Sequence, residues 1–214
     1  MKRIVLMCLF LSIITFVHAQ VSTEKDPVSI TGGVKVESSF SNFIHSGISK
    51  GSSKMNPGAT VGGFLNLGIS QYFSVQGELL FHYKESDFEW SGEKGNYQYW
   101  GAEIPVYAMY HWNRRDGSRL YVGIGPYTNF GFKATYRSNG QKLDLYEKDA
   151  SSGLPAFKDS DTGFGITGGY EFPCGLQINA SYKISVSDLL DANGSSSSLY
   201  PQLFSIGLGW RFGK

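Results

Sequence analysis

Apolar and polar residues alternate without interruption along residues 176–186. A period of two residues is typical of a β-strand with unlike faces, and about 9–11 residues is the length that a tilted strand needs to cross a bilayer. The segment therefore predicts a strand of a transmembrane β-barrel. Its two faces are Leu176, Ile178, Ala180, Tyr182, Ile184 and Val186 against Gln177, Asn179, Ser181, Lys183 and Ser185.

The same alternation recurs elsewhere and gives eight predicted strands. They span about residues 28–37, 59–69, 73–88, 97–112, 120–137, 162–172, 176–186 and 200–212. The connections after the second, fourth and sixth strands are short and the others are longer, as in barrels with short periplasmic turns and longer extracellular loops. We therefore expect an all-β fold, an eight-stranded antiparallel up-and-down transmembrane β-barrel, with both termini in the periplasm.

The polar face decides which side of the sheet meets lipid, because a soluble eight-stranded carrier with an apolar cavity shows the same alternation. This face carries about one charge per strand among Gly, Ser, Thr and Asn, which is too few for the exterior of a soluble domain. We therefore expect it to line the lumen. Its charges are Lys35, Glu78, Glu103, Lys133, Glu171, Lys183 and Arg211.

Charges inside so narrow a barrel must be paired, because the interior has room only for side chains and an unpaired buried charge is costly. We expect one internal network and one pair at the periplasmic rim: Glu78 and Glu103 with Lys35 and Lys183, and Arg211 with Glu171.

Two prolines fall inside predicted strands, although proline cannot donate to a sheet ladder. Pro105 and Pro126 would lie almost opposite each other in a hairpin that turns near Arg115 and Asp116. We expect one local bulge shared by the two strands.

The N-terminus has the pattern of a secretory signal peptide. Lys2 and Arg3 precede an apolar run, and Val17 and Ala19 supply the small groups of a cleavage site. The run is too short for a membrane-spanning helix. We expect residues 1–19 to be removed and residues 20–214 to form one outer-membrane barrel domain. Cys8 leaves with the signal peptide, so Cys174 remains without an internal disulfide partner.

Aromatic residues gather where the third to fifth strands leave the membrane and at the end of the chain. We expect an interfacial girdle, the alternative for the first group being a carbohydrate-binding platform. The girdle residues are Trp90, Tyr97, Tyr99, Trp100, Tyr136, Trp210 and Phe212.

Four short blocks, in this order and spacing, resemble the PorT-like outer-membrane β-barrel family. They are Val75–Lys84, Ala102–Val106, Tyr121–Tyr127 and Gly207–Phe212, and Trp210 stands where the family usually has Tyr. The resemblance covers nearly the whole mature chain. It implies an outer-membrane location, a barrel of about eight strands, no catalytic residues, and a link to secretion for a few members.

Candidate chemistry is sparse. His82 and His111 fall on the lumen face, where a hydrolase site of Ser, His and a carboxylate is the alternative to polar filling. The polar segment that contains Asp144, Glu147 and Asp149 is more typical of a solvated loop than of a calcium site. We expect no metal or other cofactor.

Three functions remain open from the sequence. We expect a monomeric, non-enzymatic barrel with a side-chain-filled lumen, whose role is structural or lies in loops 38–58 and 138–161, through which it meets an envelope partner. Its other partner is the lipid bilayer, and nucleic acid is not expected, because no basic stripe is present. The alternatives are an accessory component of a secretion or assembly system and a lipid-modifying barrel enzyme.

Overall fold

The computed structural model describes residues 28–46, 52–55, 57–90, 93–138, 141–144, 146, 158–187 and 198–212. The predicted signal peptide lies outside these residues. The described part forms ten β-strands: β1 (Ser29–Ser46), β2 (Ser52–Met55), β3 (Pro57–Gly68), β4 (Phe73–Trp90), β5 (Glu93–Asn113), β6 (Arg119–Ser138), β7 (Gln141–Asp144), β8 (Ser160–Glu171), β9 (Leu176–Ser185) and β10 (Ser198–Phe212).

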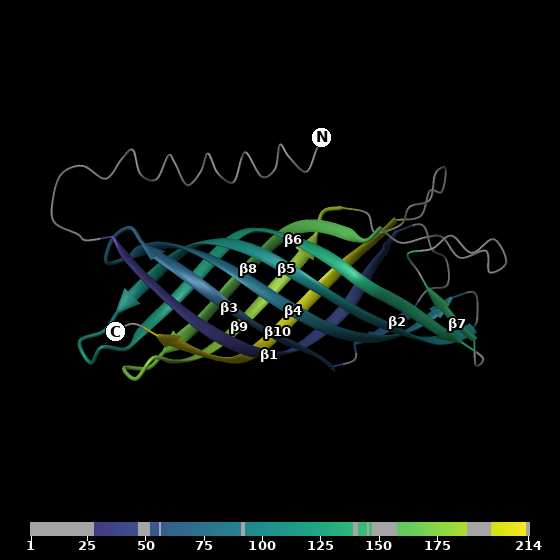
Figure 1. Ribbon diagram of the computed structural model, residues 1–214, viewed down its shortest axis with the longest axis horizontal. Helices are drawn as coiled ribbons and strands as arrows, with labels where there is room; N and C mark the ends of the chain where they lie inside the picture. Colours follow the sequence, from purple (N-terminus) through teal and green to yellow (C-terminus); the bar gives the residue numbers. More distant parts are fainter. Residues whose placement is uncertain are drawn as a thin grey trace.

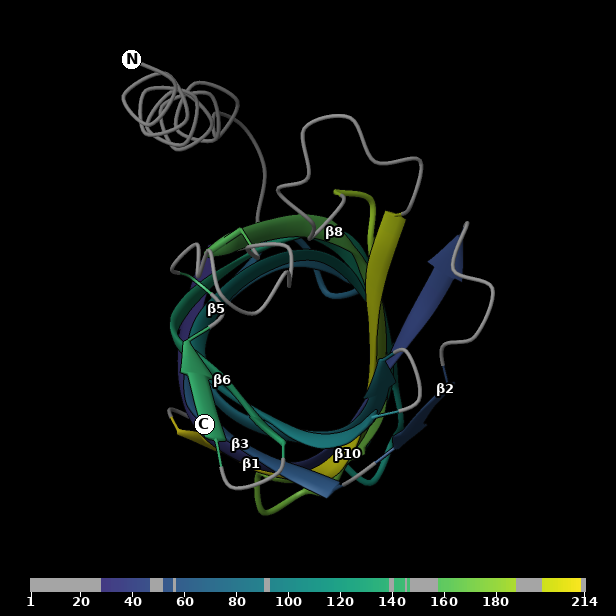
Figure 2. The same cartoon turned by 90° about the vertical axis from the view of Figure 1, so that its right-hand side faces the viewer.

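The long strands form one closed ring, which the end-on view shows (Figure 2). The order around the ring is β1-β3-β4-β5-β6-β8-β9-β10, all neighbours are antiparallel, and β10 pairs with β1 to close it. Two short strands lie outside the ring, since β2 pairs with β4 beyond the start of β3 and β7 pairs with β6. The predicted eight-stranded antiparallel barrel is therefore confirmed.

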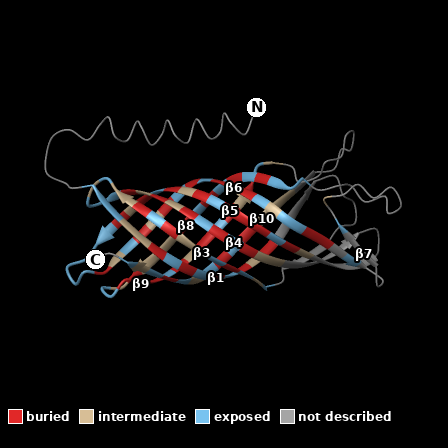
Figure 3. Ribbon diagram, in the orientation of Figure 1, coloured by how far each residue is buried: buried red, intermediate tan, exposed pale blue. Residues whose placement is uncertain are grey.

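Side chains alternate between the two faces of the ring (Figure 3). In β9, for example, Gln177, Asn179 and Ser181 are buried while Ile178 and Tyr182 are exposed. Large apolar side chains cover the outside of every strand of the ring, and this outer surface is named the apolar belt. An apolar outer band around a polar interior is the arrangement of a transmembrane barrel. Within the described residues, no helix is long and apolar enough to cross a bilayer.

The two ends of the barrel differ (Figure 1). At one end, named the turn end, lie the tight turns 69–72, 114–118 and 172–175, together with Ser29 and Phe212. Gly117 and Gly175 have φ values of 82° and 92°, which L side chains rarely adopt. At the other end, named the loop end, β4, β5 and β6 extend beyond the ring together with β2 and β7.

Much of the expected loop 38–58 is strand, which corrects that boundary. β1 runs on to Ser46 and pairs with β10 as far as Ser198. The serine-rich sequence reads as a loop, but Ser39 and Ser41 are buried inward positions of a strand. The expected loop 138–161 likewise contains β7 and the start of β8, and the rest of both loops lies outside the described residues.

The expected bulge at the two prolines is wrong. Pro105 pairs with Tyr127, and the β5–β6 ladder resumes at Ala108 and Ile124 in the same register. Pro126 pairs with Phe164 of β8. The prolines thus sit in the ladders without any inserted residue.

The register shift between β5 and β6 lies nearer the loop end. Trp100 pairs with Lys133, whereas Gly101 pairs with Gly131, so Phe132 is an extra residue. An extra residue of this kind defines a β-bulge, which reverses the side-chain alternation beyond it.

Candidate functional site: the lumen

Inward side chains fill the middle of the barrel. Tyr107 has no exposed surface, and Met109 is 2% exposed. Glycines on β6 and β8 provide the room, because a Cβ at Gly165 would lie 3.1 Å from the Tyr107 hydroxyl and one at Gly123 would collide with the Met109 sulfur. The alternation of glycine with large inward residues therefore packs the lumen with side chains.

Lys35 is the centre of the largest ionic group. Its Nζ lies 2.8 Å from Glu37 Oε1 on the same strand and 2.9 Å from Glu78 Oε2 on β4. The Ser205 hydroxyl donates to Glu37 Oε2 at 2.9 Å, and Ser181 Oγ lies 2.7 Å from Ser205 Oγ. One cation thus joins two buried carboxylates, which satisfies charges that would otherwise be costly to bury.

Hydrogen bonds continue from Glu78 toward the turn end. Gln76 Nε2 donates to Glu78 Oε1 at 2.8 Å, and Asn66 Nδ2 donates to Gln76 Oε1 at 3.2 Å. Asn66 Nδ2 also donates to Ser74 Oγ at 2.9 Å. Ser74 Oγ in turn lies 2.7 Å from His111 Nε2. The network therefore reaches from Ser181 on β9 to His111 on β5.

A second ionic group surrounds Glu103 on β5. Its carboxylate accepts a hydrogen bond from Lys183 Nζ, and its Oε2 lies 3.3 Å from His82 Nε2. His82 Nδ1 in turn lies 2.7 Å from Thr60 Oγ1. All four side chains are at most 2% exposed.

A third ionic group lies at the turn end around Glu171, which is fully buried. Arg119 donates to Glu171 Oε2 through Nε at 3.0 Å and Nη2 at 2.8 Å, and Arg211 Nη2 donates to Glu171 Oε1. Gln177 Nε2 donates to Oε2 at 2.9 Å. One carboxylate therefore holds two guanidinium groups at the rim.

Asp161 and Lys84 lie toward the loop end, on β8 and β4. Asn129 Nδ2 donates to Asp161 Oδ2 at 3.0 Å. Lys84 Nζ lies 5.1 Å from the centre of the Tyr99 ring, a cation–π distance.

The inward ionic groups of the described residues balance one another, with five cations and five carboxylates. Counted at neutral pH, they are Lys35, Lys84, Lys183, Arg119 and Arg211 against Glu37, Glu78, Glu103, Asp161 and Glu171. As far as the structure describes it, the interior is therefore filled and its charges balance.

Lys133 is the one expected lumen charge that faces outward. It is exposed and pairs with Trp100, because the bulge at Phe132 reverses the alternation of β6. The other six expected charges lie in the three ionic groups. In place of one internal network, the described contacts join Lys35 to Glu78 and Lys183 to Glu103 in two groups, and Arg211 contacts Glu171.

Four inward charges were absent from the expected lumen set: Glu37, Lys84, Arg119 and Asp161. β6 begins at Arg119 and β8 at Ser160, each slightly before the predicted start, and β1 continues well past Glu37. Extending the alternation by a residue or two would have found Arg119 and Asp161, whereas Glu37 and Lys84 already fall on the polar face of the predicted strands 28–37 and 73–88.

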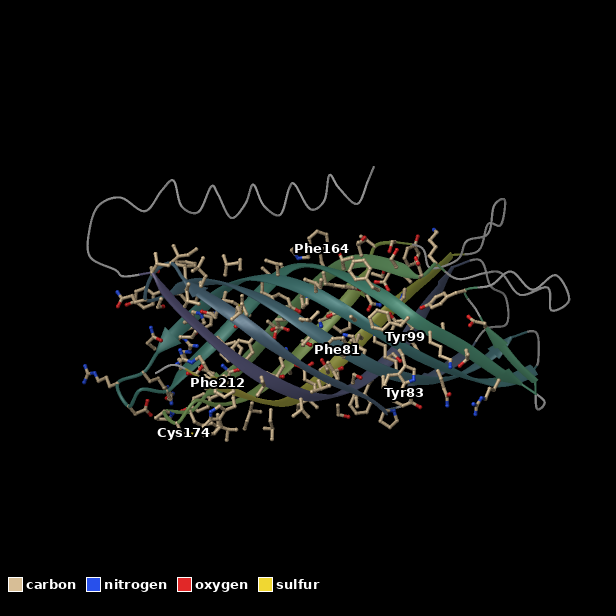
Figure 4. The ribbon with its side chains drawn as sticks, viewed as in Figure 1. Phe81, Tyr83, Tyr99, Phe164, Cys174 and Phe212 are labelled. Atoms are coloured by element: carbon tan, nitrogen blue, oxygen red, sulfur yellow. The ribbon has the colours of Figure 1, made fainter. Side chains whose placement is uncertain are left out.

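The expected aromatic girdle is corrected at Tyr99, which is 6% exposed and faces the lumen near Lys84. Trp100, Trp210 and Phe212 are exposed on the outer face. The side chains of Trp90, Tyr97 and Tyr136 lie outside the described residues. Figure 4 shows Phe212 near the turn end and Tyr83 and Tyr99 toward the loop end.

A further group of aromatic rings, outside the expected girdle, lies at the turn end. The ring centroids of Phe73 and Tyr110 are 4.9 Å apart, and those of Tyr110 and Trp112 are 4.6 Å apart. Tyr72 stacks on Tyr110 at 6.3 Å. Phe73 and Trp112 are exposed, so this group fits a membrane–water interface.

The lumen offers one arrangement with the elements of a nucleophilic site. Thr60, His82 and Glu103 place a hydroxyl, an imidazole and a carboxylate in series. These groups face inward and are almost completely buried, so a lipid outside the ring does not contact them. In the described part of the chain, no three His, Cys, Asp or Glu side chains gather as a metal site.

A closed antiparallel ring of eight strands, apolar outside and polar within, is a transmembrane β-barrel of the outer-membrane type. The family model described as "Outer membrane protein beta-barrel domain" matches residues 6–212. The chain belongs to this family, whose members are located in the outer membrane. No curated protein sequence matches it.

Solved structures of outer-membrane proteins are similar in fold. OprG from Pseudomonas aeruginosa is 15% identical, with 86% of this chain and 95% of that chain covered and a TM-score of 0.51. Ail from Yersinia pestis, solved with the heparin analogue sucrose octasulfate, is 17% identical, with 87% and 100% covered and a TM-score of 0.45. The outer membrane enzyme PagL is 11% identical, with 84% and 99% covered and a TM-score of 0.40.

Proposed function

We propose that the protein is a monomeric, non-enzymatic and non-conducting outer-membrane barrel that acts at its loop end. The signal peptide is cleaved, the turn end and both termini lie in the periplasm, and the loop end faces the outside of the cell. The observation that carries this proposal is the lumen, in which Tyr107, Lys183 and Glu103 are at most 1% exposed. General diffusion pores have about sixteen strands and a water-filled interior.

Conductance in planar bilayers tests the non-conducting state. We expect the refolded protein to give no unitary current steps above the baseline of the lipid alone. The matched variant is Tyr107→Ala with Met109→Ala, which removes two of the large inward side chains from the packed middle of the lumen. Reproducible unitary steps from the unmodified protein would overturn the proposal.

A role at the loop end is supported by the extension of β4, β5 and β6 beyond the ring, which presents a sheet edged by β2 and β7. The test is affinity capture from native membranes, comparing the unmodified chain with a variant whose residues 147–157 are replaced by a Gly/Ser linker. We expect at least one envelope protein to be lost with the replacement and retained by a turn-end variant, Arg114→Gln with Arg115→Gln. Identical captures by all three proteins would contradict the role.

Two alternative functions can be distinguished from this proposal with a deletion strain and single variants. A secretion accessory, the role that the PorT-like resemblance implies for a few members, predicts that a deletion strain fails to secrete, and that the loop replacement reproduces this failure. A lipid-modifying enzyme predicts turnover of outer-membrane lipid that His82→Ala abolishes. The burial of His82 favours the non-enzymatic function. A non-enzymatic protein predicts that the deletion strain and its parent strain have the same lipid composition.

A further inference from the structure

The bulge between β5 and β6 brings a cation to the outer surface of the barrel. Lys133 is exposed and lies opposite Trp100, which is 54% exposed, while the extra residue Phe132 is 64% exposed. Bulges commonly re-aim a side chain next to a functional site. Here the bulge places a flexible ammonium group beside two exposed aromatic rings.

The level of this surface along the barrel axis matches the edge of the apolar belt. The last β6–β8 pair is Phe130 with Ser160, and the Gly131 N–H donates to the Asp159 carbonyl at 2.6 Å. Lys133 therefore stands just beyond the last complete ring of strands. Long basic side chains at this level extend from the apolar region to the headgroups.

A second cation lies four residues further along the same strand. Arg137 is exposed and shares the outer face with Lys133, because strand residues four apart point the same way. In the β6–β7 ladder, the one described carboxylate is Asp144, which pairs with Thr135, the residue midway between the two cations. Its Oδ1 accepts a hydrogen bond from the Tyr146 N–H. Within the described part of the chain, neither cation takes part in an ion pair.

We propose that this surface, named the Lys133 patch and made of Trp100, Phe132, Lys133 and Arg137, binds a phosphate group of lipid A in the outer leaflet. The aromatic rings contact the acyl chains at the interface, and the two cations contact the phosphate. Basic clusters at a membrane surface attract anionic headgroups. The continuity of the patch with the apolar belt favours a lipid over a soluble anion. The choice of leaflet rests on the proposed orientation.

Binding of bis-phosphorylated lipid A to the full folded mature chain in detergent micelles tests the proposal, with native mass spectrometry as the readout. The variant is Lys133→Gln with Arg137→Gln, and the matched control is Arg114→Gln with Arg115→Gln at the turn end. We expect binding about 30-fold weaker in the variant, since each interfacial cation contributes severalfold. The control should bind as the unmodified protein does. Heat-modifiable gel mobility establishes that all three proteins are folded.

Three outcomes overturn the proposal: equal binding by the variant, equal loss in the control, or equal binding of dephosphorylated lipid A. Preference for phosphatidylglycerol over lipid A would assign the patch to an ordinary phospholipid and also overturns it. Because the micelle assay does not depend on orientation, its failure is distinct from a failure of the proposed function, which the conductance and capture experiments report.

Discussion

Lys35 Nζ lies 2.9 Å from Glu78 Oε2, and the strands that carry these residues are separated in the ring by β3. Both side chains are almost completely buried, with exposed fractions of 5% and 1%. The contact therefore ties together strands that are not neighbours, in addition to the backbone ladders. It is one of several contacts that cross the lumen in this way.

A double-mutant cycle on this pair should show a clear coupling. We expect Lys35→Met and Glu78→Gln together to lose less stability than the sum of the single changes, by about 1–3 kcal/mol, because each single change leaves a buried polar partner. The free energy of unfolding in lipid vesicles, from urea titration, is the measurement. The pair Lys133→Met with Glu78→Gln is the control and should be additive within about 0.5 kcal/mol.

Glu103→Gln should destabilise the barrel by about 3–5 kcal/mol, because it leaves Lys183 buried without its carboxylate partner. Urea unfolding of the refolded protein is again the measurement. Asp159→Asn is the matched control, since Asp159 is exposed, and it should change stability by no more than about 0.5 kcal/mol. Equal stability of the Glu103 variant and the unmodified protein would mean that the ionic group around Glu103 does not contribute to the free energy of unfolding.

Two glycines should respond oppositely to alanine. A Cβ at Gly125 would collide with the Val106 carbonyl oxygen, whereas a Cβ at Gly77 would have no neighbour within 4 Å. We expect Gly125→Ala to reduce the refolded fraction strongly and Gly77→Ala to leave it unchanged, as measured by heat-modifiable mobility. The same loss in both variants would show that the close approach at Gly125 is not the cause.

Cys174 gives a test of orientation, because it is exposed in the turn 172–175 (Figure 4). With the turn end in the periplasm, a membrane-impermeant maleimide should label it only after the outer membrane is permeabilised. The matched variant is Asp159→Cys with Cys174→Ser, which moves the thiol to the loop end and should be labelled in intact cells. The reverse pattern would place the turn end outside.

Asp116 is expected to titrate below the usual range of an aspartate. Its Oδ1 accepts the Ser118 hydroxyl at 2.6 Å and the Ser118 N–H at 2.9 Å, and these hydrogen bonds lower the pKa of the carboxyl. A lowered folded pKa stabilises the turn above the unfolded pKa, and this contribution is lost as the pH falls through the folded value. Ser118→Ala should raise the pKa in an NMR titration. An unchanged pKa would assign the shift to the backbone N–H alone.

Alternation predicted the strands well because lipid imposes one rule on every position of the outer face. β9 begins at Leu176 as expected and ends one residue before the predicted Val186. Lys35, Glu78, Glu103 and Lys183 were placed inward for the same reason. The alternation pattern does not predict where a bulge will interrupt it. The bulge at Phe132 depends on the fit between two strands, so the orientation of Lys133 could not be read from β6 alone.

Other differences arose where composition was given more weight than alternation. Tyr99 was assigned to the interface as an aromatic, although its neighbour Trp100 occupies the outward position. Ser39 and Ser41 were assigned to a loop, although they continue the inward face of β1. The prolines were expected to interrupt the alternation with a bulge, but Pro105 lies in β5 without a local shift of register. Alternation alone would have placed Tyr99, Ser39 and Ser41 inward, whereas the fit of the prolines into the ladders depends on tertiary structure.

The seam between β1 and β10 joins the first described strand of the chain to the last. The polypeptide therefore cannot close while it is still being translated, and β1 has an unpaired edge until β10 arrives. Exposed edges of this kind promote aggregation. Barrel closure is accordingly a post-translational event, and we expect the unclosed chain to need protection of this edge until β10 pairs with β1.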